Sequence, residues 1–222
     1  LLDLKKFKNS DTLVILGPGP SLNDLTNSQK LELEQYDIAG LSYTCFFSIK
    51  QTFYFLETFT KKNQYNDLAH ILHNEVEKRY NEKTIKVCII KNPENKLASK
   101  YLNLAFFKKI ITLQILSHRN QVVIKFLKLS LRFKFLKSVL FQSRGSLIAL
   151  INFGLILGYK KIIFCGVDLN TSDYFFENKN HPELCSVFRN HYTVPPTTVH
   201  TTIDPKYGKP IDETICFISN SF

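Results

Sequence analysis

Six short runs of apolar residues recur along the chain, and most of them lack the polar alternation of a strand with one exposed face. They predict β-strands at residues 12–16, 36–42, 52–56, 84–90, 161–166 and 215–219. Continuously apolar strands are typical of a parallel sheet that is covered on both faces.

Longer segments with apolar residues at helical spacing separate these runs. They predict helices at residues 21–35, 63–80 and 145–159 and within a basic segment at about 105–140. Alternating strands and helices predict an α/β fold, with a Rossmann-like, largely parallel sheet flanked by helices. A length of 222 residues without a Pro/Gly/Ser linker predicts a single domain covering residues 1–222.

Charge is unevenly distributed along the chain. The net charge is +10, and no acidic residue lies between Glu94 and Asp168, where thirteen lysines and arginines occur. Such a field attracts an anionic partner. Nucleic acid is not expected, because the basic residues alternate with Leu, Ile and Phe instead of Gly, Ser and stacking aromatics.

The basic segment has one apolar stripe at spacings of three and four residues. The stripe is formed by Phe126, Leu129, Phe133, Leu136 and Leu140, and it is flanked by Lys125, Lys128, Arg132 and Lys137. This pattern favours a helix in peripheral contact with an anionic membrane. A helix that faces the protein core and exposes a basic back fits the pattern equally well.

Five scattered cysteines without a CxxC pair predict a reducing compartment and no structural zinc. No run approaches the roughly 18 apolar residues of a membrane span, and the first ten residues lack a signal-peptide core. We therefore expect a cytoplasmic protein. Because no methionine occurs, we also expect the numbering to begin inside a longer chain.

The turn "GPGPS" at residues 17–21 follows the first predicted strand. Gly17 and Gly19 permit close backbone approach, Pro20 presets the backbone for a helix, and Ser21 offers a hydroxyl beside helix-start N–H groups. These features predict a site for a phosphate-like anion. The turn is neither a dinucleotide fingerprint, whose third glycine is Leu22 here, nor a P-loop. A purely structural strand-to-helix turn is the alternative.

Two further motifs are expected at the same edge of the sheet. Arg144, Gly145 and Ser146 open an apolar helix, and Asp168 follows a buried strand. In open α/β sheets, ligands bind beyond the carboxyl ends of the strands, where the strand order reverses. A carboxylate there can bind sugar or ribose hydroxyls, whereas Ser146 and Asp168 can also serve only as caps.

The motifs "LGPGPSL" at 16–22, "SRGSLIALINFGLILGYKKIIFCGVDL" at 143–169 and "TTVHTT" at 197–202 occur in this order. Together they resemble the bacterial sialyltransferases of glycosyltransferase family 42 and related enzymes that transfer acidic sugars from CMP donors. The resemblance implies a single nucleotide-binding domain of a GT-A-like variant type. It also implies inverting, metal-independent transfer without a cofactor, to a lipooligosaccharide or capsule glycan or glycolipid. With the basic segment, it places the protein at the inner face of the cytoplasmic membrane.

The resemblance also implies roles for individual residues. Contacts to CMP and the donor sugar would come from Gly17, Gly19, Ser21, Ser42, Gly145, Ser146, Gly166, Asp168 and Asn170. Tyr174, with Tyr192 as a possible helper, would stabilise the departing phosphate, and His200 would be the general base, with His191 as the alternative.

Two departures from the family pattern leave the donor open. Pro18 replaces an asparagine that would contact the nucleotide, and Asn170 stands where a phosphate-binding tyrosine is expected. A CMP-Kdo-dependent Kdo transferase is therefore an alternative. So is a non-catalytic module that binds a membrane surface or nucleic acid. A methyltransferase or dehydrogenase is disfavoured, because Ser42 and Tyr43 stand where an acidic residue would hold a ribose. A homo-oligomer is compatible with the sequence.

Overall fold

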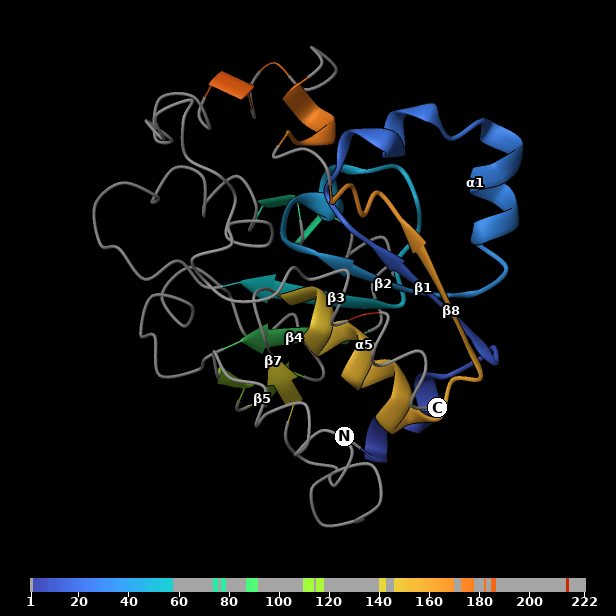
Figure 1. The fold of residues 1–222 in the computed structure, drawn as a ribbon, viewed down its shortest axis with the longest axis vertical. Coiled ribbons are helices and arrows are strands. Elements are labelled where there is room, and N and C mark those ends of the chain that lie inside the picture. The colour runs from blue at the N-terminus through green and yellow to red at the C-terminus, as the bar shows by residue number, and fades with distance from the viewer. Residues whose placement is uncertain are drawn as a thin grey trace.

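A parallel six-stranded sheet forms the centre of the molecule in the computed structural model (Figure 1). The structure describes residues 2–57, 74–75, 77–78, 87–91, 110–113, 115–117, 140–142, 146–169, 173–177, 182, 185–186 and 215. The strand order is β5-β4-β3-β2-β1-β8, and every pairing is parallel. The strands are β1 (Thr12–Leu16), β2 (Asp37–Leu41), β3 (Phe53–Glu57), β4 (Val87–Lys91), β5 (Ile110–Leu113) and β8 (Lys161–Cys165).

The predicted Rossmann-like parallel sheet is confirmed. β1 has the predicted bounds, and β2, β3, β4 and β8 differ from the predictions by one to three residues at their ends. Only Ile215 of the predicted strand at 215–219 is described, and it is helical, so the strand prediction is wrong at this residue. The single-domain prediction stays a prediction.

Three strands lie in the basic segment, where the apolar spacing predicted a helix. They are β5 and a separate parallel pair, β6 (Ile115–Ser117) and β7 (Leu140–Gln142). The helix prediction is therefore wrong at Leu140, which begins β7 and is fully buried. Strands of three or four residues are too short for their period to stand out from a Phe- and Leu-rich background.

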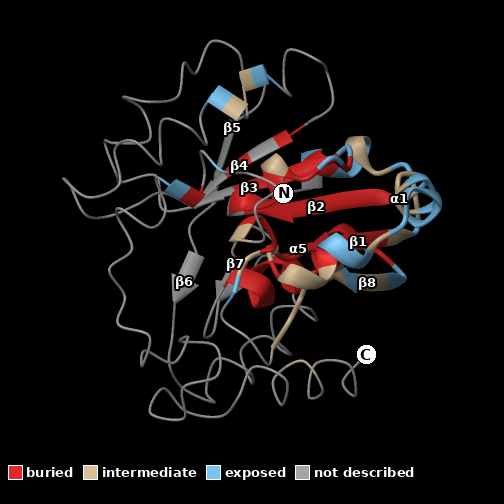
Figure 2. Cartoon of the chain, turned by 90° about the horizontal axis from the view of Figure 1, so that it is seen from above, coloured by how far each residue is buried: buried red, intermediate tan, exposed pale blue. Residues whose placement is uncertain are grey.

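The sheet separates two apolar clusters, because alternate residues of each strand point to opposite faces. Leu13 and Ile15 of β1 belong to the cluster that contains α5 (Ser146–Leu157), whereas Val14 and Leu16 belong to the other. The second cluster also contains the aromatic residues of η3 (Ser42–Phe46) and η6 (Phe175–Glu177), two short 3-10 helices. Figure 2 shows that β1, β2 and α5 form the buried centre.

Helix α5 is buried nearly all round, since it contacts β1 on one side and β7 on another. A helix packed on several sides needs apolar residues in every direction, and this explains its uniformly apolar sequence. It ends in a Schellman motif at Gly158, whose φ is 77°. The Gly158 N–H donates to Leu155 O, and the Tyr159 N–H donates to Gly154 O, both at 3.1 Å.

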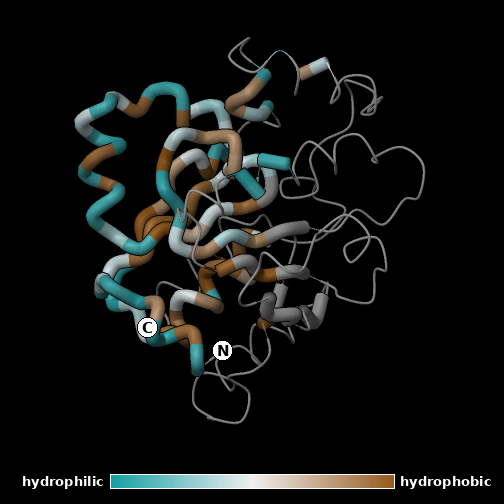
Figure 3. The backbone as a smooth tube through the Cα atoms, turned by 180° about the vertical axis from the view of Figure 1, so that it is seen from behind, coloured by the Kyte–Doolittle hydropathy of each residue, from teal (hydrophilic) through white to brown (hydrophobic). Residues whose placement is uncertain are grey.

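The predicted helix at 21–35 is divided into η2 (Pro20–Asp24) and α1 (Asn27–Leu33). Thr26 causes the division, because it forms a reciprocal capping box with Gln29 and so starts a new helix. None of the α1 residues is buried, and most of this helix is coloured as hydrophilic along the backbone tube of Figure 3.

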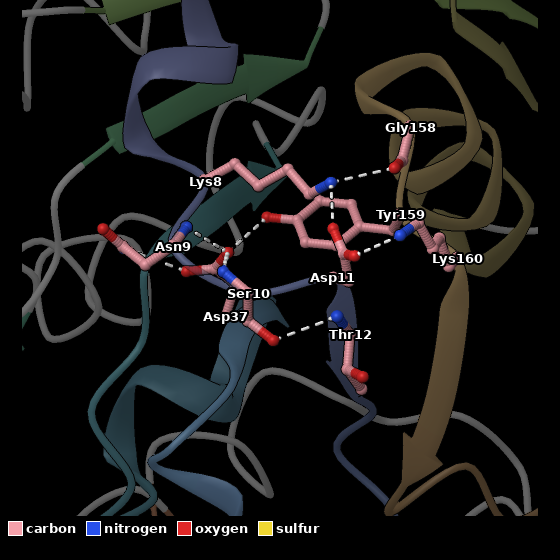
Figure 4. Close-up of polar contacts among 9 residues, drawn as sticks. All are labelled: Lys8, Asn9, Ser10, Asp11, Thr12, Asp37, Gly158, Tyr159 and Lys160. Atoms are coloured by element: carbon pink, nitrogen blue, oxygen red, sulfur yellow. Dashed lines mark hydrogen bonds and ion pairs between the residues drawn. The ribbon is translucent and has the colours of Figure 1, made fainter.

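A buried carboxylate joins three segments at the amino end of the sheet (Figure 4). Asp37 is 1% exposed and accepts hydrogen bonds from Asn9 N at 2.7 Å, Ser10 N at 3.0 Å and the Tyr159 hydroxyl at 2.9 Å. Burial, followed by the Asp37 charge and this hydrogen bond, raises the pKa of Tyr159. This network fixes the N-terminal segment and the end of α5 on β2.

Two lysines share the carboxylate of Asp11 beside this network. Lys160 Nζ lies 2.6 Å from Asp11 Oδ2, and Lys8 Nζ lies 3.0 Å from Oδ1. The hydrogen bond from Lys160 and then that from Lys8 hold the pKa of Asp11 below its usual range. Lys8 Nζ also donates to Gly158 O at 2.9 Å, which places a cation at the C-terminus of α5.

Of the helices in the described ranges, none combines the length and the apolar character that crossing a bilayer requires.

Candidate functional site

The strand order reverses at β1, which pairs with β2 on one side and with β8 on the other. β2 to β5 extend the sheet in one direction, and β8 extends it in the other. The carboxyl end of β1 and that of β8 therefore flank the switch point at which open α/β sheets bind ligands. The two predicted motifs, 17–21 and 166–168, follow these two strand ends directly.

The turns after β1 and β8 interlock through their backbones. The Gly17 N–H donates to Cys165 O, and the Gly19 N–H donates to Gly166 O, both at 2.8 Å. A Cβ atom at Gly17 would overlap Gly166 O, and one at Gly166, whose φ is 65°, would overlap Gly17 O and Leu22. Close contact between the two turns thus explains why glycine is needed at both positions.

Asp168 lies against the start of η2. Its Oδ2 accepts a hydrogen bond from the Ser21 N–H at 2.8 Å, and a Cβ at Gly19 would overlap this carboxylate. The N-cap residue of η2 is Gly19, which has no side chain to accept this bond. Asp168 therefore supplies, from the other side of the switch point, the acceptor that an N-cap side chain normally provides.

Every backbone N–H of the 17–22 turn is therefore bonded within the protein. Pro18 and Pro20 have no N–H, and the Leu22 N–H donates to Gly19 O at 3.3 Å. The expectation of free helix-start N–H groups for a phosphate is wrong, because Asp168 already places a negative charge at this helix start. Contacts from these residues to a nucleotide stay a prediction, and they would have to come from other atoms.

Two oxygen atoms of this turn region accept no hydrogen bond from the residues that the structure describes. In the described part of the chain, no hydrogen bond reaches Asp168 Oδ1 or Ser21 Oγ, and both residues are partly exposed. A fixed carboxylate oxygen accepts hydrogen bonds, and a hydroxyl both donates and accepts. This pair suits the hydroxyl groups of a sugar or ribose better than a phosphate.

Tyr174 lies next to this region in an aromatic cluster. Its ring stacks on Phe176, with centroids 5.2 Å apart and planes at 9°, and it meets Tyr43 edge-on at 5.3 Å. Its backbone N–H donates to Glu177 Oε1 at 3.0 Å. The segment 174–177 contacts the glycine turn directly, because the Phe175 N–H donates to Pro18 O at 2.9 Å.

Two further residues of the predicted site, Ser42 and Ser146, lie at the starts of helical segments. Ser42 begins η3 directly after β2, beside Tyr43, and Ser146 is buried as the first residue of α5. Helix α5 leads to the amino end of β8, so its first residue, Ser146, lies at the carboxyl edge of the sheet. However, α5 packs on the face of the sheet opposite the cluster that contains Tyr174. Six residues of the predicted site lie outside the described ranges: Arg144, Gly145, Asn170, His191, Tyr192 and His200.

Cys165 is the last residue of β8, and its carbonyl accepts the hydrogen bond from the Gly17 N–H. Partial burial raises the pKa of its thiol, which disfavours the thiolate. In the residues with described positions, no three His, Cys, Asp or Glu side chains gather as a metal site.

The sequence does not predict the contact that Asn23 makes or the packing of Tyr43 against Tyr174. Asn23 Nδ2 donates to Phe175 O at 2.8 Å, across 152 positions of sequence. No local signal marks such a contact. Tyr43 could have been suspected only from its place directly after the second strand.

No family model matches the chain, and no curated protein matches it. The chain is similar to a solved structure described as a MAf glycosyltransferase from Magnetospirillum magneticum AMB-1, with 13% identity and a TM-score of 0.41. The alignment covers 73% of this chain but only 23% of that protein. The α/β assignment therefore rests on the sheet topology described above.

Proposed function

We propose that the chain is a glycosyltransferase that takes sialic acid or a related acidic sugar from a CMP donor. The observation that supports this most is the position of Asp168 at the switch point. Its Oδ2 is fixed by the Ser21 N–H at 2.8 Å, and in the described part of the chain no group donates a hydrogen bond to its Oδ1. The sugar class and the CMP moiety rest on the sequence resemblance alone.

In this proposal, Asp168 and Ser21 bind hydroxyl groups of the donor, such as those of its ribose. The phosphate lies away from the Asp168 charge, toward Tyr174, which stabilises it as CMP departs. His200 removes the proton of the acceptor hydroxyl as that oxygen attacks the anomeric carbon. The basic segment at 105–140 contacts anionic lipid and holds the protein near a membrane-linked acceptor.

Thermal-shift measurements with CMP, UMP, GDP and NAD test the nucleotide part of the proposal. Ligands that bind only the folded state raise Tm, so a selective shift with CMP is expected. Asp168→Asn should lose most of that shift, whereas Asp24→Asn, an exposed carboxylate at the end of η2, should keep it. A shift with all nucleotides, or with none, would contradict the proposal.

Transfer from CMP-sialic acid and from CMP-Kdo then tests the reaction. His200→Ala should abolish transfer while leaving CMP affinity within a few-fold, and unchanged turnover would refute the assignment of the base. Vesicles with anionic lipid test the membrane contact. Replacing Lys125, Lys128, Arg132 and Lys137 with Gln should release the protein from them, and full retention would refute this contact.

A further inference from the structure

Asn23 is exposed, yet its side chain makes a specific long-range contact. Its Nδ2 donates to Phe175 O at 2.8 Å, and this is the only hydrogen bond that its side chain makes in the described part of the chain. Most exposed asparagines bond to water or to residues nearby in sequence. A contact across 152 positions therefore indicates that Asn23 holds a distant segment in place.

Both backbone polar groups of Phe175 are bonded to the glycine turn and η2. Its N–H donates to Pro18 O at 2.9 Å, and its C=O accepts from Asn23 Nδ2. Two bonds on one residue fix both the position and the direction of the chain at this point. Because Tyr174 directly precedes Phe175, the same two bonds limit where its backbone can lie.

The ring of Tyr174 is limited by its neighbours as well. Phe176 stacks on one face of the ring, and Tyr43 meets it edge-on. Phe176 follows Phe175 in η6, so a shift of Phe175 would move both stacked rings relative to Tyr43. Asn23 thus acts on Tyr174 through the backbone of residue 175.

We propose that Asn23 is a positioning residue, which fixes the segment 174–177 and with it the ring of Tyr174 beside the glycine turn. The catalytic consequence rests on the proposed function, in which Tyr174 stabilises the departing phosphate. The proposal that Asn23 positions the segment 174–177 does not depend on the proposed function.

Amide hydrogen exchange tests the positional part. Asn23→Ala removes the donor, and Asn23→Asp replaces it with an oxygen that repels Phe175 O. Both should speed exchange in the 174–177 peptide about tenfold, with the larger effect for Asp. Asn27→Ala, which removes an exposed amide at the start of α1, is the matched control and should leave exchange unchanged. Unchanged exchange in both Asn23 variants would overturn the proposal.

Kinetics with a CMP-sugar test the catalytic consequence. Asn23→Ala should lower kcat several-fold with little change in KM, because the bond to the departing phosphate strengthens in the transition state. In a Tyr174→Phe background, Asn23→Ala should have no further effect, whereas additive losses would show that Asn23 does not act through Tyr174. If the wild-type protein neither binds CMP nor transfers sugar from a CMP donor, the proposed function is wrong. The hydrogen-exchange result then still shows whether Asn23 positions the segment 174–177.

Discussion

Asp168 accepts a hydrogen bond from the Ser21 N–H at 2.8 Å, although 147 positions separate the two residues. A glycine-containing turn that leads from a strand into a helix normally suggests an anion from solution. In this protein the anion at the helix start is a side chain of the chain itself. In the described part of the chain, no hydrogen bond reaches the other oxygen of this carboxylate, Oδ1.

Replacing Asp168 separates its structural role from its binding role. Asp168→Ala should lower the free energy of unfolding by about 1–2 kcal/mol, because the Ser21 N–H loses its acceptor. Asp168→Asn retains an oxygen acceptor and should stay within about 0.5 kcal/mol of wild type. Urea unfolding of the three proteins measures this. Equal losses for Ala and Asn would mean that charge, and not the hydrogen bond, stabilises the turn.

Gly166 and Gly158 form a matched pair, since both have positive φ but only one is crowded. A Cβ at Gly166 would overlap Gly17 O and Leu22, whereas one at Gly158 would meet nothing within 4 Å. Gly158→Ala should lower the free energy of unfolding by about 1–2 kcal/mol, the penalty for a left-handed residue with a side chain. Gly166→Ala should lower the free energy of unfolding by about 3 kcal/mol or more, because the overlap of the new Cβ with Gly17 O and Leu22 adds to that penalty. Denaturant unfolding checks the order, and similar losses would show that the two turns can move apart.

Tyr159→Phe should change both the stability and its dependence on pH. At pH 7 the variant should be about 1–2 kcal/mol less stable, because the buried Asp37 loses one donor.

The pKa of Tyr159 is raised in the folded state, so its contribution is fully present below the unfolded pKa of about 10. Above pH 10 the unfolded chain releases this proton first, and the advantage of wild type over Tyr159→Phe should shrink by up to about 1.4 kcal/mol per pH unit. Urea unfolding between pH 7 and 10.5 measures the difference. Tyr36→Phe is the control, and a difference independent of pH would contradict the assigned cause.

Cys165 should react slowly with iodoacetamide at pH 8, because burial raises the pKa of its thiol and the thiolate is the reactive form. We expect a rate at least about tenfold below that of the urea-unfolded chain. Peptide mapping by mass spectrometry follows this residue separately from the other cysteines. Equal rates in the folded and unfolded protein would show that the end of β8 is open to solvent.

The sequence predicts β1, β2, β3, β4 and β8 of the central sheet, but not β5, and it predicts the two motifs at the switch point. Buried parallel strands are continuously apolar, and ligand-binding turns follow their carboxyl ends. The sequence does not predict the partners of those motifs. Ser21 looked like the start of a ligand site, since nothing local shows that Asp168 occupies its N–H. Asn23 and Phe175 were missed for the same reason. Contacts between residues about 150 positions apart depend on the whole fold, and a single sequence does not encode them as a pattern.

The pairing of β1 with β8 also has a consequence for how the protein folds. β1 lies near the beginning of the chain and β8 follows about two thirds of it, so their pairing closes a very long loop. Such contacts form late and slowly. During synthesis, the glycine turn therefore emerges from the ribosome well before Asp168 and Phe175 exist to complete it. A chain that stops short of β8 would leave the Gly17, Gly19 and Ser21 amides without their acceptors, and the switch point between β1 and β8 would not form.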